Sequence, residues 1–279
     1  MKKFYKIILI LLLSLTFLVW SKVAKSPTAS NVSVYFLDVG QGDAALIQKG
    51  NYQILIDGGP DDKVLTGLGK VMPLTDRKIE VMILSHPHAD HLVGLNQILD
   101  RYEIGQIYMT GVLYTSNQYL EFLSKIKEKN ITANTSLVGD EFKPFDGSTF
   151  TFLWPGDQYR EKEIDNLNNS SIVSKFCYLQ KCVLLTGDIE TDAQSEMFAY
   201  YSKNIEIFKS DILKIPHHGS INGINESLLN IVAPKEAIIE VGADNKFGHP
   251  HKQTIDLLEK SNIRIHRTDR DGTIKFNFD

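Results

Sequence analysis

The stretch LSHPHADHLVGL, residues 84–95, places three histidines and one aspartate within six positions. His86 and His88 are two residues apart, so in an extended segment their side chains project to the same side. Asp90 and His91 follow, at the start of a segment with helical spacing. Imidazole nitrogens and carboxylate oxygens suit zinc, and also manganese or iron. The pattern therefore predicts a site that can address two metal ions.

Other polar clusters also follow predicted strands. Seven of the eight histidines lie in three clusters, and only His266 lies outside them. Loops at strand ends can converge on one crevice while the sheets hold them rigid. We therefore expect one site built from segments that are far apart in the chain. The clusters besides residues 86–91 are Asp38 with GQGD, Asp57 with GG, the TGD that ends at Asp188, PHHGS with His217 and His218, and GHPH with His249 and His251.

The elements that must position these clusters can be read from the apolar pattern. Short apolar runs such as residues 79–85 and 210–216 predict buried strands. Residues 91–102 and 117–130 carry apolar side chains at helical spacing. Strands come first and helices after in each half, which predicts one α/β domain of two mixed sheets packed face to face, with helices outside. The tail is expected to close with a strand pair around the turn at Asp271–Gly272.

Residues 1–25 have the pattern of an export signal. A basic start is followed by a 14-residue apolar run and then by a polar stretch. The run is short for a membrane span, which needs about 20 apolar residues. We expect either a cleaved signal peptide or a retained membrane anchor, then a linker at residues 26–31 and one domain at residues 32–279. That domain should be secreted, or membrane-anchored and facing the outside.

The charge of the exported part bears on its substrate. Without the five lysines of residues 1–25, 25 basic side chains remain against 34 acidic ones, a net charge of −9. Binding nucleic acid mainly through overall charge needs a basic surface. The negative net charge therefore argues mildly against broad DNA binding, although it is compatible with a local basic groove. Lys175 and Lys214 could hold phosphate, but for each the favoured interpretation is a solvated or snorkelling surface lysine.

Cys177 and Cys182 flank a predicted hairpin turn at Leu179 and Gln180. If these two residues form the loop, the cysteines face each other as a non-hydrogen-bonded pair, in which side chains come closest. Export would permit a disulfide, but the loop lacks the Gly or Asn that such turns prefer. We therefore favour two free, buried thiols.

These segments together resemble a known family. The spacing His86-x-His88-x-Asp90-His91 resembles the signature of the metallo-β-lactamase superfamily. The segments FLDVGQGDAALI, ILIDGG, LLTGDIE, LKIPHHGS and GHPH occur in the order found in the hydrolase domain of the competence protein ComEC, and they resemble that domain and its free-standing relatives. The resemblance runs from about Val32 to the C-terminus and implies a four-layer αββα sandwich.

The resemblance implies six metal ligands. Two histidines match the pair on a first metal, an Asp–His pair matches the second metal, and one aspartate matches a carboxylate that bridges both. His217, at a strand end, is preferred over His218 as the last ligand of the second metal. The implied ligands are His86, His88, Asp90, His91, Asp188 and His217.

The resemblance also implies residues that act beside the metals. His249 is preferred over His251 as a histidine that faces the substrate. Asp90, His249 and His218 are the catalytic candidates, and either histidine could protonate a leaving group.

Other side chains would support the ligands. Asp57 matches a carboxylate that orients ligand histidines, and Asp38 and Asp43 are alternatives for that role or turn caps beside glycine. Many superfamily members place a third histidine on the first metal, but here the matching stretch, NLNNSSIV, has none. Amide and hydroxyl oxygens bind zinc weakly and suit manganese better, so two divalent ions, zinc or manganese, are expected. The candidates to stand in for the third histidine are Asn168, Asn169 and Ser170.

The resemblance implies an exported hydrolase that uses a hydroxide held between two metal ions. A phosphodiesterase or nuclease is the leading interpretation, with DNA or a cell-surface polymer such as a teichoic-acid phosphocholine ester as substrate. Association with a membrane through the N-terminus is expected in the anchored case, and no obligate protein partner is inferred. The alternatives are a hydrolase of β-lactams or other acyl esters, and a non-catalytic binding module for DNA uptake.

Overall fold

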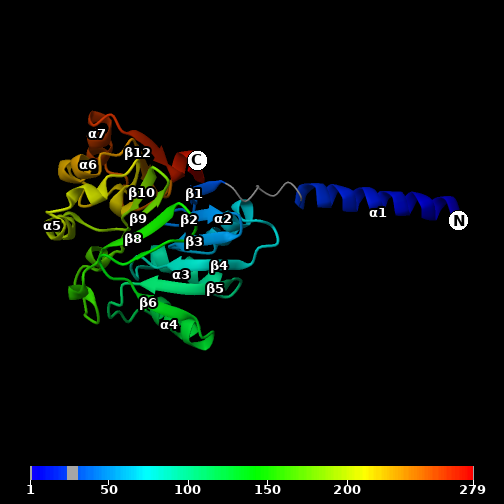
Figure 1. Cartoon of the computed structure of the whole chain (residues 1–279), viewed down its shortest axis with the longest axis horizontal. Helices are drawn as coiled ribbons and strands as arrows, with labels where there is room; N and C mark the ends of the chain where they lie inside the picture. Colours follow the sequence, from blue (N-terminus) through cyan, green and yellow to red (C-terminus); the bar gives the residue numbers. More distant parts are fainter. Residues whose placement is uncertain (1, 24–30, 279) are drawn as a thin grey trace.

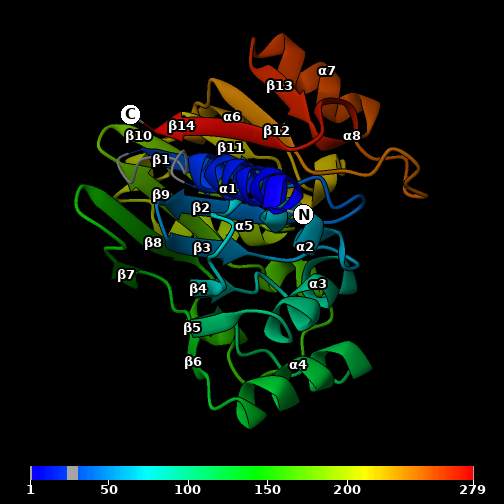
Figure 2. The same cartoon turned by 90° about the vertical axis from the view of Figure 1, so that its right-hand side faces the viewer.

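The computed structural model of the protein describes residues 2–23 and 31–278. Two seven-stranded mixed sheets form the centre of the molecule, and helices cover their outer faces (Figure 1, Figure 2). Three buried apolar clusters fill the spaces between helices and first sheet, between the two sheets, and between second sheet and helices. The predicted four-layer αββα sandwich is therefore confirmed.

Each sheet takes most of its strands from one half of the chain. The first sheet contains, in spatial order, β14 (Ile274–Phe278), β1 (Val32–Phe36), β2 (Ala45–Lys49), β3 (Tyr52–Ile56), β4 (Lys78–Ile83), β5 (Glu103–Met109) and β6 (Thr132–Thr135). The second sheet contains, again in spatial order, β13 (Arg264–Arg267), β12 (Glu236–Ile239), β11 (Ile212–Lys214), β10 (Lys181–Leu185), β9 (Val173–Tyr178), β8 (Ser148–Trp154) and β7 (Glu141–Phe142).

The helices follow the strands in both halves. Three of them pack on the first sheet, namely α2 (Lys63–Val71), α3 (Ala89–Leu99) and α4 (Asn117–Glu128). Three others pack on the second sheet, namely α5 (Thr191–Tyr200), α6 (Glu226–Val232) and α7 (Lys252–Lys260). The remaining helical segments are α1 (Lys2–Val23), η1 (Asp157–Tyr159), η2 (Leu167–Ser170), η3 (Ile205–Phe208), η4 (Pro216–Gly219) and α8 (Thr268–Asp271).

Strand β4 illustrates why the buried end of a central strand is apolar at consecutive positions. Val81 and Ile83 are buried between the two sheets, whereas Met82 is buried under the helices of the outer layer. A strand that is covered on both faces has no solvent side, so successive residues are all apolar. This burial holds the carboxyl end of β4 rigidly in place, and the histidine-rich segment begins there.

The C-terminal strands differ from the sequence-based expectation. β13 pairs with β12 in the second sheet, whereas β14 pairs with β1 in the first. The predicted strand pair around Asp271–Gly272 is therefore wrong. Helix α8 and Gly272, with φ of 66°, carry the chain from one sheet to the other. A pattern of alternating residues predicts a strand but not its partner, because pairing depends on contacts between distant segments.

The N-terminal residues form helix α1, which projects from the sandwich (Figure 1). Every described side chain from Phe4 to Leu18 is exposed. Among the described residues, no helix combines the length and hydropathy needed to cross a membrane. Residues 26–30 of the predicted linker lie outside the described residues. The signal peptide and the anchor both stay predictions.

The β9–β10 hairpin corrects the expectation of free thiols. Cys177 and Cys182 are directly opposite each other in the strand pair, and they form a disulfide. Leu179 and Gln180 form the predicted two-residue loop, and Leu179 adopts a φ of 53°. The absence of Gly or Asn misled the prediction, because the flanking strands impose this left-handed conformation on a leucine.

Candidate metal centre

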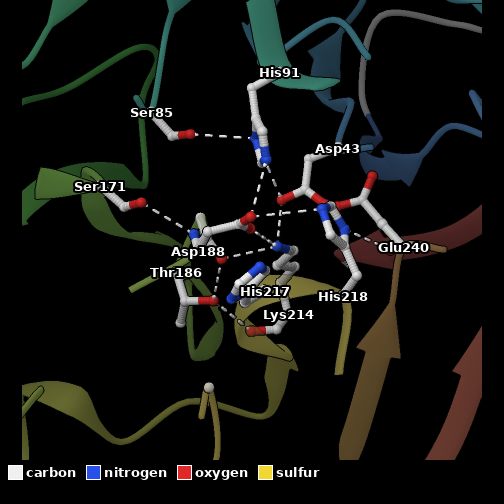
Figure 3. A network of polar contacts seen from close by, with 12 residues as sticks. Asp43, Ser85, His91, Ser171, Thr186, Asp188, Lys214, His217, His218 and Glu240 are labelled. Atoms are coloured by element: carbon white, nitrogen blue, oxygen red, sulfur yellow. Dashed lines mark hydrogen bonds and ion pairs between the residues drawn. The ribbon is translucent and has the colours of Figure 1, made fainter. Parts of the chain in front are cut away.

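The site lies at the carboxyl ends of neighbouring parallel strands in both sheets. β3 and β4 are parallel, so Asp57 and Ser85 leave the first sheet at the same edge. β10, β11 and β12 are also parallel, so Asp188, His218 and Glu240 follow adjacent strands of the second sheet. Figure 3 shows how side chains from these segments converge. The expected convergence of loops at strand ends is confirmed.

Four side chains form a compact group of potential ligands. Asp90, His91, Asp188 and His218 offer ligand atoms that all lie within 4.8 Å of one another. His218 Nε2 is 3.2 Å from Asp90 Oδ2 and 3.5 Å from Asp188 Oδ2. His91 Nε2 is 3.2 Å from Asp188 Oδ2, yet it is buried and makes no hydrogen bond within the described part of the chain. Two imidazoles and two carboxylates suit a divalent ion, so the residues fit a metal.

Both histidines of this four-residue group are held through their other ring nitrogen. His91 Nδ1 lies 2.9 Å from Asp57 Oδ2, and Asp57 Oδ1 accepts a hydrogen bond from Ser85 N–H at 2.7 Å. His218 Nδ1 lies 2.9 Å from the carbonyl oxygen of Glu240. A hydrogen bond donated by Nδ1 fixes the tautomer that leaves Nε2 available to a metal. Asp57 thus lies where a carboxylate that orients ligand histidines was expected.

Replacing Asp57 with asparagine should weaken metal binding, because the amide cannot hold His91 as firmly as the carboxylate does. We expect a loss of affinity on the order of 10- to 100-fold, measured by titrating metal-free protein with manganese or zinc. Asp38→Asn is the matched control, since Asp38 is exposed and its side chain caps Gly40 N–H at 3.3 Å. Equal losses in the two variants would contradict the role of Asp57.

The structure brings His218, rather than the preferred His217, into the four-residue group. The two residues lie in η4 with φ/ψ of 50°/49° and 52°/23°, so the backbone turns sharply between them. His217 Nδ1 lies 3.1 Å from Glu190 Oε1, outside the four-residue group. The sequence could not separate the two histidines, because their directions depend on this left-handed turn.

His86 and His88 lie beside the four-residue group rather than in it. His86 Nε2 is 3.0 Å from His88 Nδ1, and the rings of His86 and His91 are 4.2 Å apart. Burial, with the neighbouring His91, lowers the pKa of both residues. They are therefore neutral at pH 7, which is the form of imidazole that binds metals. A second ion on this pair stays a prediction.

Of the stand-ins for a third histidine, Asn168 is the one whose side chain contacts His217, at 3.4 Å. Asn168 donates to Glu190 Oε1 at 3.1 Å, and its own Oδ1 is buried without a hydrogen-bond partner among the described residues. Asn169 instead accepts from Glu190 N–H at 3.2 Å, and Ser170 donates to a backbone carbonyl of its own turn at 2.7 Å. Asn169 and Ser170 therefore brace the loop.

Lys214 is 1% exposed and lies against the metal group (Figure 3). Its ammonium forms ion pairs with Asp43 and with Asp188, the latter at 3.4 Å, and it donates to the carbonyl of Gly187 at 2.8 Å. Burial opposes its charge, but Asp43, Asp188 and Glu240 outweigh burial and raise the pKa of Lys214. The expected surface lysine is therefore wrong here, and the buried ammonium cannot reach a substrate phosphate.

Lys175 also differs from the expectation. It is half-buried on β9, and its ammonium donates to the carbonyl of Ile207 at 2.7 Å. Burial lowers the pKa of this lysine. Its hydrogen bond joins β9 of the second sheet to η3, so this lysine has a structural role.

A second possible ligand group is already satisfied by protein partners. Asp43, Asp57 and His91 also offer atoms within 4.8 Å of one another. Asp43 is paired with the Lys214 ammonium, and Asp57 holds His91 and Ser85 N–H. All three side chains are thus engaged by protein partners, whereas His91 Nε2, which faces the four-residue group, has no hydrogen-bond partner among the described residues. The four-residue group is therefore the better metal centre.

The charges of the four-residue group depend on one another. Burial opposes ionisation of Asp188, but His218, His91 and Lys214 outweigh it and hold its pKa well below the usual value. Burial likewise opposes protonation of His91 and His218, but Asp188 and the neighbouring carboxylates raise both pKa values, that of His218 to about 10. In the metal-free protein both His91 and His218 are therefore protonated. A metal that binds their Nε2 atoms must displace these protons.

His249 borders the metal centre. Its ring centroid is 6.3 Å from that of His218 and 5.5 Å from that of His217. Burial, with both of these histidines, lowers its pKa to about 4. His249 is therefore uncharged at neutral pH, and it suits a hydrogen-bonding role better than that of an acid. His251 is the N-cap residue of α7, and its Nδ1 accepts from Ile221 N–H at 3.2 Å.

Several supporting residues were missed from the sequence. Ser171 Oγ accepts from Asp188 N–H at 3.1 Å and lies 3.3 Å from His86 Nδ1. Lys214 and Glu240 could have been found from the sequence. Lys214 interrupts an apolar strand run, and Glu240 directly follows one. A charged side chain at such a position is buried and needs a partner. Glu240 accepts from Ala44 N–H at 2.9 Å, and burial, with Asp43, raises its pKa to about 8.

A large hollow lies away from this site. A cavity of about 970 Å³ is lined by residues at the opposite ends of β10, β11 and β12, among them Lys181, Asp211 and Lys235. No group of metal-ligating side chains lies there within the described residues. The location of the site therefore rests on its donor atoms rather than on cavity size.

Comparison with known proteins decides the family. Residues 37–242 match the sequence profile of the family Lactamase_B, described as the metallo-beta-lactamase superfamily. The chain belongs to the metallo-β-lactamase superfamily. The match covers most of the chain and includes all four residues of the candidate metal group.

Curated relatives narrow the position within this superfamily. The chain is 26% identical over 270 residues to ComE operon protein 3 of Bacillus subtilis, covering 90% of this chain and 33% of that protein. It is 28% identical to Recombination protein 2 of Haemophilus influenzae, covering 96% of this chain and 31% of that protein. The chain is thus distantly homologous to ComEC-family proteins and spans about a third of their length.

Solved structures support the fold alone. YhfI of Bacillus subtilis, a metallo-beta-lactamase fold protein, superposes with a TM-score of 0.56 at 13% identity, covering 88% of this chain and all of that one. Zn(2+)-bound PqqB of Methylobacterium extorquens superposes with a TM-score of 0.52 at 12% identity, over the same shares of the two chains. Together with the buried His/Asp group, these findings describe a ComEC-related protein of the metallo-β-lactamase fold whose side chains fit a metal.

Proposed function

We propose that this protein is a metal-dependent hydrolase of phosphodiesters, with nucleic acid as the leading substrate. The observation that carries the proposal is the four-residue group Asp90, His91, Asp188 and His218, in which only Asp90 is partly exposed. An exposed ligand on one side and buried ligands on the other leave the cation open to a substrate from one direction. The names Competence protein ComA and Recombination protein 2, given to relatives, favour DNA over a cell-surface polymer.

Divalent cations at such a site lower the pKa of water and neutralise charge that develops on phosphate oxygens. In this proposal Asp90, His91, Asp188 and His218 hold one ion, and His86 and His88 take part in holding a second. Zinc and manganese both suit the donors. Asp57 and the Glu240 carbonyl keep both imidazoles aimed at the ion, because they bind Nδ1. His249, which is neutral and borders the metal centre, would form a hydrogen bond with the substrate.

We also propose that the domain works outside the cytoplasm. The basic and apolar N-terminus has the pattern of an export signal, and it would either be removed or keep the protein at the membrane. The Cys177–Cys182 disulfide supports an oxidising compartment. Detecting the protein in the medium or in washed membranes of its own cells would test this location.

Metal removal tests the catalytic proposal. We expect protein stripped with a chelator to lose activity on a nitrophenyl phosphodiester and on plasmid DNA, and to regain it with manganese or zinc, since no protein group replaces the cation. A chromogenic cephalosporin serves as the comparison substrate. Hydrolysis of the cephalosporin alone would favour the acyl-hydrolase class. Metal uptake without hydrolysis of any substrate would favour a binding module.

A further inference from the structure

One large aromatic side chain is exposed beside the metal centre. Phe247 is 64% exposed and lies in the loop between β12 and α7. Its ring stacks on that of His249, with centroids 5.7 Å apart and an interplanar angle of 25°. Because one face of the phenyl ring covers His249, the exposed part of the ring is available to a ligand.

The loop holds Phe247 in place through a single organising side chain. Asn245 Nδ2 donates to the carbonyls of Gly242 at 2.8 Å and His249 at 2.7 Å. Asn245 Oδ1 accepts from Phe247 N–H at 3.2 Å and from His249 N–H at 3.0 Å. Four hydrogen bonds from one amide fix the turn, so the exposure of Phe247 does not come from a loose segment. A preorganised apolar surface binds a ligand with little ordering cost.

The stacked pair Phe247 and His249 lies next to the candidate metal ligands. The ring of His249 is 6.3 Å from that of the ligand His218, and His218 Nε2 is 3.2 Å from Asp90 Oδ2. His249 Nδ1 is buried and without a hydrogen-bond partner in the described part of the chain. A substrate whose phosphate lies at the metal centre would therefore place its neighbouring group against Phe247.

We propose that Phe247, stacked on His249, binds a nucleobase of a single-stranded nucleic acid next to the phosphodiester at the metal centre. This inference rests on the proposed function and selects between its two substrate classes. A base offers a flat face that stacks on one aromatic ring, whatever its sequence. A choline ester would instead need several aromatic faces around its ammonium, and no Phe, Tyr or Trp ring stacks with Phe247 among the described residues.

Paired oligonucleotides test the stack by binding. One is a short oligothymidylate, and the other is an abasic oligomer of equal length, both with phosphorothioate linkages that slow cleavage. We expect metal-loaded protein to bind the first more tightly, by about fivefold to a hundredfold, as measured by fluorescence anisotropy. In Phe247→Ala this ratio should fall toward one, and in Phe247→Trp it should be retained. Leu179→Ala, an exposed leucine of the β9–β10 loop, is the matched control and should keep the wild-type ratio.

The outcomes separate this inference from the proposed function. A wild-type binding ratio of one, or a ratio that Phe247→Ala leaves unchanged, would overturn the nucleobase site. If the unmodified oligomers are then cleaved with equal KM, the proposed phosphodiesterase function is supported and only the nucleobase site at Phe247 is rejected. If metal-loaded protein cleaves neither oligomer, the proposed function fails, while the binding ratio still decides the stack.

Discussion

Asp188→Asn should abolish most metal binding and hydrolysis while leaving the fold intact. Asparagine has nearly the shape of aspartate, but it removes the negative charge that faces His91 and His218 at 3.2 and 3.5 Å. A bound cation supplies several kcal/mol of transition-state stabilisation, so we expect the rate to fall by about a thousandfold or more. Metal content per chain, measured by elemental mass spectrometry, should fall together with the rate.

A matched control separates this effect from a general loss of charge. Asp192 is exposed in the first turn of α5, so Asp192→Asn should keep both metal content and activity. A fully loaded and active Asp188→Asn protein would show that Asp188 is not a ligand. A variant that binds metal normally but is inactive would limit Asp188 to a role in positioning the substrate or water.

Lys214→Met should destabilise the metal-free protein strongly. Methionine fills a similar volume, but it leaves the buried carboxylates of Asp43 and Asp188 without the ammonium that pairs with them. Removing one partner of a buried ion pair costs about 3–5 kcal/mol. Denaturant unfolding of chelator-treated protein measures this loss. We also expect metal to stabilise this variant more than the wild type, because a cation at Asp188 replaces part of the missing charge.

Lys235→Met is the control for the loss of a lysine. Lys235 pairs with Asp211 at 2.9 Å, but its side chain is 79% exposed. Exposed ion pairs contribute about 0–1 kcal/mol, so this variant should unfold almost as the wild type does. A Lys214→Met protein of normal stability would mean that one of the carboxylates takes up a proton instead, and that the ammonium is not needed to balance the charges.

Local signals in the sequence were sufficient for the scaffold of the site. The apolar run of β4 and the dense HPHADH segment predicted where ligands leave the first sheet, and the TGD and PHHGS segments did so for the second. Such signals succeed because the part of a strand that is covered on both faces is mostly apolar at consecutive positions. Asp57 was also predictable, since a ligand histidine needs a partner for its second nitrogen.

Other features depend on contacts that no local pattern contains. The choice of His218 over His217 follows from two left-handed residues in η4. The burial of Lys214 follows from Asp43, which is 171 residues earlier in the chain, being brought beside β11. The Cys177–Cys182 disulfide required a leucine at φ 53°, which only the paired strands impose.

The sequence by itself therefore determined the family of chemistry, because the types and spacing of donor atoms are set within a few residues. It also determined the layers, because periodic burial is a local property of each strand and helix. The tertiary structure alone decided which imidazole joins the four-residue group, which ammonium neutralises the carboxylates, and that Phe247 stands exposed beside them. Those three choices are set by backbone turns and by side chains from distant segments, whose energies exist only once the two sheets have packed.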